Sequence, residues 1–269
     1  MLATSTHDTK LSEDVRARLC VLSELPQEWQ AALQRFSQLN QSKKSRVDGE
    51  LAPDRNDEYL LYQALIGAFP SGELTAEARA GFRERIVQYM MKAIKEAKVH
   101  TSWINQNEPY EAAVRDFILG IVPLAFESEE QAQQSFAAEL AQFARRVAGF
   151  GRWTSLSQCL LKLTSPGVPD IYQGCELWNL TLVDPDNRGP VDFATRQRTL
   201  QELRERATAI DAVALSRELL ETSEDGRIKL YTIWKTLGLR RARQQLFTDG
   251  DYQPLLLQGA HAENVCAFS

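Results

Sequence analysis

The sequence predicts an α/β chain in which helices dominate the first half and short strands enter later. Apolar residues recur at helical spacing through most of residues 12–150, as expected for amphipathic helices that share one core. From Thr164 onward, prolines, glycines and short apolar runs replace that spacing, which is typical of strands that lead into loops. The content of 43% hydrophobic and 25% charged residues is ordinary for a globular protein with a sizeable core.

The composition also excludes several classes of protein. A net charge of -5 leaves no basic surplus for binding nucleic acid, and no apolar run approaches the roughly 20 residues of a membrane span. The 4 cysteines lie far apart and form no CxxC pair, so we interpret them as free thiols in a reducing cytoplasm. The 3 histidines are equally dispersed, and we therefore expect no metal site and no cofactor.

The first half divides into helical segments separated by one long polar loop. Residues 41–54, which include the basic tract Lys43-Lys44-Ser45-Arg46, are predicted to be this solvated loop. Asn56 is the expected cap of the helix that follows. The helical segments are expected at about 12–25, 25–40, 56–69, 75–100, 108–124 and 128–148, with another beginning near Trp153.

The second half carries the strand and turn signals. Residues 164–178 combine two prolines, two glycines and a short apolar run that suits a buried strand, and residues 182–193 are rich in turn formers. A helix is expected at about 194–208, and a strand is predicted to begin at residues 228–231 after a glycine turn. The chain opens in a polar motif and closes on the strand-like run NVCAFS, so we interpret it as a piece cut at both ends.

Four ordered segments carry a resemblance to a known family. They are THDTK with SEDVR near the start, the pair NDEYLLYQALIGAFP and EAKVHTSWINQNEPYE, then SPGVPDIYQGCELW, and finally LVDPDNRGPVDF. In this order they resemble maltooligosyltrehalose synthases, a family of the alpha-amylase superfamily, over nearly the whole chain. Three positions depart from the residues usual in the family, which are a basic residue, Thr and Arg: Leu11, Cys175 and Gly189.

The resemblance implies the C-terminal part of a (β/α)8 barrel, strands seven and eight, with a large α-helical insertion at about 12–150. Residues 1–225 would form the partial catalytic domain, and residues 226–269 the beginning of a C-terminal β domain. Two short parallel strands are expected side by side, around residues 1–8 and 166–172. Parallel strands need a long crossover, which the helical lobe would supply.

The resemblance also implies an activity. The family are isomerases, intramolecular transglucosidases that convert the reducing-end α-1,4 linkage of a maltooligosaccharide into an α,α-1,1 linkage in trehalose biosynthesis. His7-Asp8 matches the family motif with the carboxylate that stabilises the transition state, so that role is expected for Asp8, and sugar contacts are expected for His7 and Lys10. No segment matches the nucleophile or general acid, so the isolated chain is expected to be inactive without the N-terminal part of the enzyme. Further substrate-binding candidates are Trp103, Asp186 and Arg188.

Alternatives stay open for each of these residues. Taken without the family, His7-Asp8 would be a helix-capping and turn cluster ahead of residues 12–18. Asp186 and Arg188 suit either sugar hydroxyls or a buried turn held by hydrogen bonds of Asx side chains. Trp103 has the alternative of a packing residue, and Glu176 either lines the pocket or pairs with an arginine. For the chain as a whole, the alternatives are another alpha-amylase-type glycosidase and a self-contained, non-catalytic helical carbohydrate-binding or interaction module.

Overall fold

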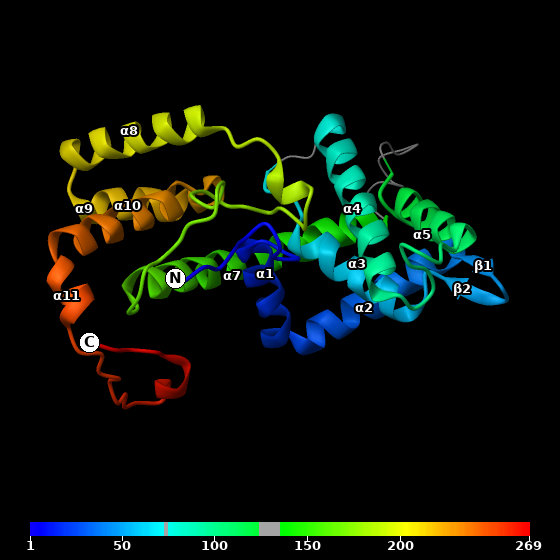
Figure 1. Ribbon diagram of the computed structural model, residues 1–269, viewed down its shortest axis with the longest axis horizontal. Coiled ribbons are helices and arrows are strands. Elements are labelled where there is room, and N and C mark those ends of the chain that lie inside the picture. Colours follow the sequence, from blue (N-terminus) through cyan, green and yellow to red (C-terminus); the bar gives the residue numbers. More distant parts are fainter. Residues whose placement is uncertain (73–74, 124–134) are drawn as a thin grey trace.

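The computed structural model describes residues 1–72, 75–123 and 135–269. Helices supply nearly all the regular structure of this described part, and its one sheet is a two-stranded hairpin (Figure 1). None of the described helices combines the length and apolarity that crossing a bilayer requires. The helices are α1 Glu13–Glu24, α2 Pro26–Asn40, α3 Arg55–Gly67, α4 Ala76–Ala97, α5 Glu108–Ile121, α7 Phe136–Thr164, α8 Phe193–Ala209, α9 Ala212–Glu221, α10 Arg227–Ala242 and α11 Gln244–Asp249, and the strands are β1 Ser45–Val47 and β2 Glu50–Ala52.

Helices α1 to α5 and the long α7 share one apolar core, as the helical spacing of residues 12–150 predicts. Phe36 of α2, Tyr62 of α3 and Phe136 of α7 lie at the centre, with their ring centroids 5.1 to 5.6 Å apart. Such tilted and edge-on aromatic pairs stabilise a core beyond the apolar area that they bury. These helices therefore form one packed unit, while their place as an insertion between barrel strands stays a prediction.

Helix α7 connects this lobe to a second group of helices. It packs against α1 along one side and against α10 further along, and α8 to α10 bury a smaller core of leucines and isoleucines (Figure 1). The sequence predicts separate helices over 128–148 and from Trp153, but residues 136–164 form one continuous helix, and residues 128–134 lie outside the described part. Gly151 inside α7 has a structural reason, because a Cβ there would lie 3.0 Å from the Arg18 backbone of α1.

The predicted loop at residues 41–54 is wrong in its central part, which forms the β1–β2 hairpin. Asp48 and Gly49 both have positive φ, 51° and 85°, as the two-residue turns of tight hairpins require. Lys44 is not solvated either, because its Nζ lies 2.7 Å from a carboxylate oxygen of Glu58 and both side chains are buried. The cap of α3 is Asp54 rather than Asn56, since the Asp54 side chain accepts the N–H of Asp57.

The parallel pairing expected between the two ends of the lobe is present in reduced form. Leu2 and Pro169 form one parallel bridge, in which Leu2 N–H donates to Val168 O at 2.7 Å and Asp170 N–H donates to Leu2 O at 2.8 Å. An antiparallel bridge between Leu11 and Leu182 lies beside the start of α1. The two segments therefore lie side by side at this bridge, but neither forms a strand, and the barrel strands stay a prediction.

The predicted strand at residues 228–231 is wrong, because these residues form the first turn of α10. Gly226, at φ 82°, ends the preceding turn, and the Asp225 side chain accepts the N–H of Arg227 at 2.9 Å. The buried positions Lys229, Ile233 and Thr236 then follow at helical spacing. In the expected C-terminal β region, the strand character of the described residues is one antiparallel bridge between Pro254 and Phe268.

Candidate active-site surface

The THDTK segment forms a tight polar turn between Thr6 and Thr9. Thr9 Oγ1 donates to Thr6 O at 2.8 Å, and Asp8 N–H donates to Thr6 Oγ1 at 3.2 Å. The turn leaves the side chains of His7 and Asp8 in solvent, 54% and 85% exposed, with His7 Nε2 3.2 Å from Asp8 Oδ2. Asp8 does not cap α1, since the first helical N–H, that of Glu13, donates to Ser5 Oγ at 2.8 Å. The cluster therefore forms a turn and does not cap α1, while the catalytic role of Asp8 stays a prediction.

A second turn, residues 183–188, makes hydrogen bonds to the backbone of the THDTK turn. Asn187, which is buried, donates its Nδ2–H to His7 O at 2.9 Å and to Thr6 O at 3.3 Å. Tyr172 Oη donates to the backbone carbonyl of Asn187 at 3.1 Å. Three of the four segments that carry the resemblance therefore meet at one place. The sequence could not indicate this role of Asn187, because its partner lies 180 residues away.

The charged residues of the second turn are engaged within the protein. Arg85 of α4 donates to both carboxylate oxygens of Asp186, at 2.8 and 2.9 Å, and Leu182 N–H donates to one of them at 2.7 Å. The half-exposed Arg188 pairs with Asp184 at 2.8 Å. These contacts are those of the buried-turn alternative, whereas a sugar contact by Asp186 or Arg188 stays a prediction.

The C-terminal end of α4 contacts both turns. Lys10 Nζ lies 2.8 Å from a carboxylate oxygen of Glu96, and Lys92 Nζ donates to the backbone carbonyl of Asp184 at 2.9 Å. Lys92 and Glu96 are 3.9 Å apart on the same face of the helix. This end of the helical lobe is therefore fixed to the surface that presents His7 and Asp8.

Trp103 lies at the surface rather than in the core, in the segment between α4 and α5. Its ring faces Lys95, whose Nζ is 5.0 Å from the ring centroid. Trp103 is therefore not a core residue, and its sugar contact stays a prediction. Glu176 pairs with Arg196 at 2.9 Å, as its second alternative states.

A buried charge network that no sequence pattern indicates lies at the start of α1. Lys229 of α10 is 0% exposed, and its Nζ lies 2.7 Å from Glu13 and 2.8 Å from Asp14 at the start of α1. Ser155 of α7 donates to Asp14 at 2.7 Å, and Asn179 N–H donates to the same carboxylate at 2.7 Å. The network thus joins α1, α7, α10 and the 175–179 segment.

The pKa values in this network follow from burial and from the paired charges. Burial lowers the pKa of Lys229, but the carboxylates of Asp14 and Glu13 outweigh it and raise the pKa above its usual value. Burial raises the pKa of Glu13, but Lys229, Thr4 and Lys162 together lower it below its usual value. Thr4 donates to Glu13 and accepts from Lys162 Nζ at 2.7 Å, so the network also holds the segment that leads into the THDTK turn.

A smaller cluster joins His100, Asp54 and Asp57 near the start of α3. One nitrogen or oxygen of each lies within 4.8 Å of the others, which is close enough for these groups to share a cation. Their contacts are nevertheless made within the protein: His100 Nε2 lies 2.8 Å from Asp54, and Tyr110 Oη donates to Asp57 at 2.6 Å. Burial raises the pKa of Asp57, whereas at Asp54 burial is outweighed by hydrogen bonds from the backbone and His100 that lower the pKa, so Asp57 is the weaker carboxylate ligand of the two.

Over its whole length, the sequence of this chain is similar to a curated protein of Mycobacterium tuberculosis. No family model matches the chain. A protein of Mycobacterium tuberculosis (strain H37Rv) named putative maltooligosyl trehalose synthase is 35% identical over 268 residues, which cover 100% of this chain and 29% of that protein. The chain matches one segment of a maltooligosyltrehalose synthase. This confirms the resemblance predicted from the four ordered segments.

Solved structures support the same match to maltooligosyltrehalose synthases. A crystal structure of a maltooligosyl trehalose synthase superimposes with a TM-score of 0.80 at 38% identity, covering 99% of this chain and 32% of that one. The maltooligosyltrehalose synthase of Arthrobacter ramosus gives 0.72 at 33% identity, covering 98% and 30%. A hypothetical maltooligosyl trehalose synthase of Sulfolobus tokodaii gives 0.73 at 36%, covering 95% and 30%. The chain thus spans about a third of the length of these relatives.

Proposed function

We propose that this chain serves maltooligosyltrehalose formation and supplies the carboxylate that stabilises the transition state. The observation that carries the proposal is the THDTK turn, which projects Asp8 into solvent while Asn187 holds its backbone from beneath. The remaining catalytic groups belong, in this proposal, to polypeptide that corresponds to the rest of the relatives' length. The substrate is a maltooligosaccharide, whose reducing-end α-1,4 linkage is converted into an α,α-1,1 linkage.

The architecture proposed for this activity is the end of a (β/α)8 barrel. The parallel bridge between Leu2 and Pro169 supports neighbouring strands seven and eight, with α1 to α7 between them. The THDTK turn would then follow the C-terminal end of strand seven, where barrels place their chemistry. The C-terminal β domain is proposed to begin after α11 rather than at residue 226, because Lys229 of α10 is buried against Glu13 and Asp14.

The proposed role of Asp8 is electrostatic. Cleavage of a glycosidic bond develops positive charge on the sugar ring, and a fixed carboxylate beside that ring stabilises the charge as it forms. His7 and Lys10 stand on the same turn, where they can donate hydrogen bonds to sugar hydroxyls. Retaining chemistry also needs a nucleophile and an acid about 5 Å apart, so the 269-residue chain alone is expected to form no trehalose-terminated product.

The test is Asp8→Asn in a protein of the relatives' full length that contains this segment. Loss of a charge aimed at the transition state typically costs 10²–10³ in rate, so we expect kcat to fall by about that factor with little change in KM. Thermal stability should not change, because the Asp8 side chain is exposed. Asp116→Asn, an exposed aspartate of α5, is the matched control.

Steady-state kinetics on maltopentaose measures both constants for each variant. The isolated chain serves as the negative control for turnover. A near-normal kcat for Asp8→Asn would show that Asp8 is only a turn residue. Formation of trehalose-terminated product by the isolated chain would contradict the division of catalytic groups proposed above.

A further inference from the structure

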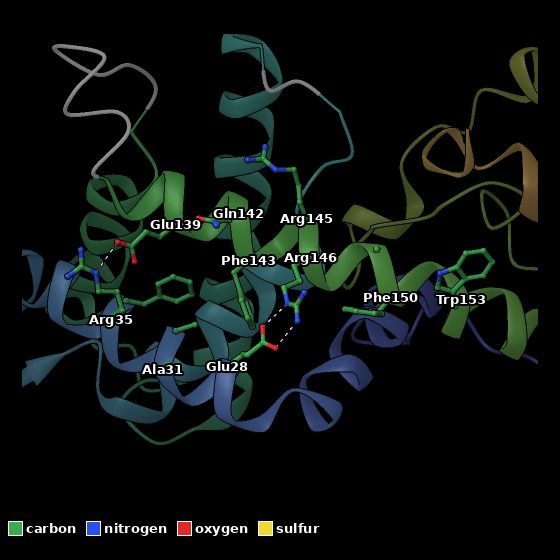
Figure 2. A pocket seen from close by; sticks show the side chains of 13 residues that line it. Glu28, Ala31, Arg35, Glu139, Gln142, Phe143, Arg145, Arg146, Phe150 and Trp153 are labelled. Atoms are coloured by element: carbon green, nitrogen blue, oxygen red, sulfur yellow. Dashed lines mark hydrogen bonds and ion pairs between the residues drawn. The ribbon is translucent and has the colours of Figure 1, made fainter. Parts of the chain in front are cut away.

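A long groove of about 870 Å³ lies between α2 and α7, and none of the predicted site residues lines it (Figure 2). One wall is a stripe of α7 from Glu139 to Trp153, at intervals of three and four residues, so its members share one helix face. At 1.5 Å per residue this stripe is about 21 Å long. The groove is thus suited to an extended ligand rather than a compact one.

Two ion pairs cross the groove and hold its walls together. Arg35 of α2 lies 2.9 Å from Glu139, and Arg146 of α7 makes two contacts with Glu28, at 2.6 and 2.8 Å. Figure 2 shows both pairs as dashed lines, with Phe143 between them. The Phe143 ring is supported from behind by Trp29, stacked at 5.8 Å between centroids. Paired charges therefore alternate with an aromatic surface along the groove.

The aromatic surface continues beyond the second ion pair. Phe150 and Trp153 are 47% and 53% exposed, and the Arg146 guanidinium lies 5.5 Å from the Phe150 ring centroid. Gly149 leaves open space on this face, since a Cβ there would meet no atom within 4 Å. Phe150 and Trp153, three residues apart on α7, therefore add exposed aromatic surface to the groove.

We propose that this groove binds a linear α-1,4-glucan, so that a maltooligosaccharide is held along α7. The proposal rests on the proposed function for its ligand class. A pyranose ring has apolar C–H faces and a rim of hydroxyls, and the faces can pack on Phe143, Phe150 and Trp153. Hydroxyls both donate and accept, so the rim can bind the guanidinium N–H groups and the carboxylate oxygens while both ion pairs stay intact.

The same features disfavour a polypeptide in the groove. An amphipathic helix docks through an apolar face in an apolar groove. Here it would cover Arg146–Glu28 and Arg35–Glu139, and each buried pair would lose solvation that an apolar face cannot replace. A glucan replaces that solvation with its own hydroxyls, so the charges and the aromatic rings favour the sugar.

The experiment follows the indole N–H signals of the 269-residue chain, labelled with ¹⁵N at its 5 tryptophans, during titration with maltoheptaose. The Trp153→Phe variant assigns the Trp153 signal. We expect this signal to shift and saturate with a Kd on the order of 1 mM, as for an open, solvated site. Trp178 is the internal reference, because it does not line the groove and its N–H donates to the Ser223 carbonyl.

Variants separate the groove from other sugar contacts. Phe150→Ala and Arg146→Ala should each weaken binding about tenfold, whereas Arg198→Ala, an exposed arginine of α8, should leave Kd unchanged. Asp8→Asn should also leave it unchanged, so failure here and failure of the proposed function are distinguishable. A Trp153 signal that does not move at a maltoheptaose concentration about tenfold above the expected Kd overturns the proposal. An equal shift with the β-1,4-linked cellopentaose overturns its α-1,4 specificity.

Discussion

Replacing Lys229 by Met tests whether the buried charge network stabilises the fold. The side chain is 0% exposed, and its Nζ contacts Glu13 at 2.7 Å and Asp14 at 2.8 Å. Methionine fills a similar volume but carries no charge, so the substitution leaves two carboxylates without their principal counter-charge. Lys162 remains, 3.4 Å from Glu13, and compensates only part of that charge.

The expected loss is about 3–5 kcal/mol of unfolding free energy, the usual cost of removing one partner of a buried ion pair. That loss exceeds what apolar packing of the methionine can recover, because the cost comes from the carboxylates left behind. The pair itself is not thereby worth 3–5 kcal/mol, since the measurement includes the penalty of the unpaired groups. Urea denaturation at pH 7 gives the free energy, with equal m-values for the two proteins showing that the two-state analysis holds.

The pH dependence gives a second, independent readout. The pKa of Glu13 in the folded protein lies below its usual 4.5, so its stabilising contribution is present above pH 4.5 and is lost as the pH falls through the folded value. The pKa of Lys229 lies above 10.5, so its contribution is present below pH 10.5 and is lost as the pH rises through the folded value. In Lys229→Met, burial raises the pKa of Glu13 because its principal counter-charge is gone. Protonation of Glu13 then removes the free-energy cost of the buried, unpaired charge. The difference between the two proteins should therefore shrink as the pH falls from 7 toward 4.

Lys235→Met on the exposed side of the same helix is the matched control, with an expected loss of at most about 1 kcal/mol from its contact with the Trp234 ring. A Lys229→Met loss below about 1 kcal/mol would refute the reasoning. A loss that stays constant on acidification would also refute it, because the penalty would then not come from charged carboxylates.

Two further predictions concern the THDTK turn and the thiols. Asn187→Ala removes both hydrogen bonds to the turn, which are worth about 1 kcal/mol. Hydrogen exchange at the Thr9 amide should therefore accelerate about fivefold. An unchanged exchange rate would contradict the anchoring role of Asn187. Burial raises the pKa of Cys159 to about 11 and that of Cys175 to about 12. At pH 8 iodoacetamide should therefore modify the exposed Cys20 and Cys266 first, which peptide mass mapping would show. Equal labelling of all four thiols would contradict the burial of Cys159 and Cys175.

The local elements were the most predictable from sequence. Helix α8 begins and ends within one residue of its predicted bounds, and α4 lies within its predicted segment with Thr75 as cap. Both depend on spacing and capping that neighbouring residues decide. The hairpin at Asp48-Gly49 was missed although its turn dipeptide is a recognised signal. The strand at 228–231 failed because three apolar residues do not distinguish a strand from a helix until Ile233 and Thr236 are included.

The candidate site was less accessible to sequence reasoning. The THDTK segment stands out by its polarity and its resemblance, but its support comes from Asn187, 180 residues away. The Lys229 contact with Asp14 spans 215 residues. Nothing within a helical window marks Lys229 as buried, because its neighbours Ile228 and Leu230 would suit an exposed lysine between them equally well. Such contacts exist only after the chain has folded, and no local pattern encodes them.

In the proposed function, the backbone contacts around Asp8 position its exposed carboxylate. Asn187 donates a hydrogen bond to the backbone of the turn, at His7 O. Before the turn, Thr4 hydrogen-bonds Glu13 and Lys162. After Asp8, Lys10 pairs with Glu96 of α4. The Asp8 side chain itself meets His7 within the turn. Electrostatic stabilisation requires a charge that does not have to reorganise when the reaction occurs. In the proposed function, the hydrogen-bonded turn would meet that requirement without burying the Asp8 charge, since the buried ion pairs are those of Lys229 with Glu13 and Asp14.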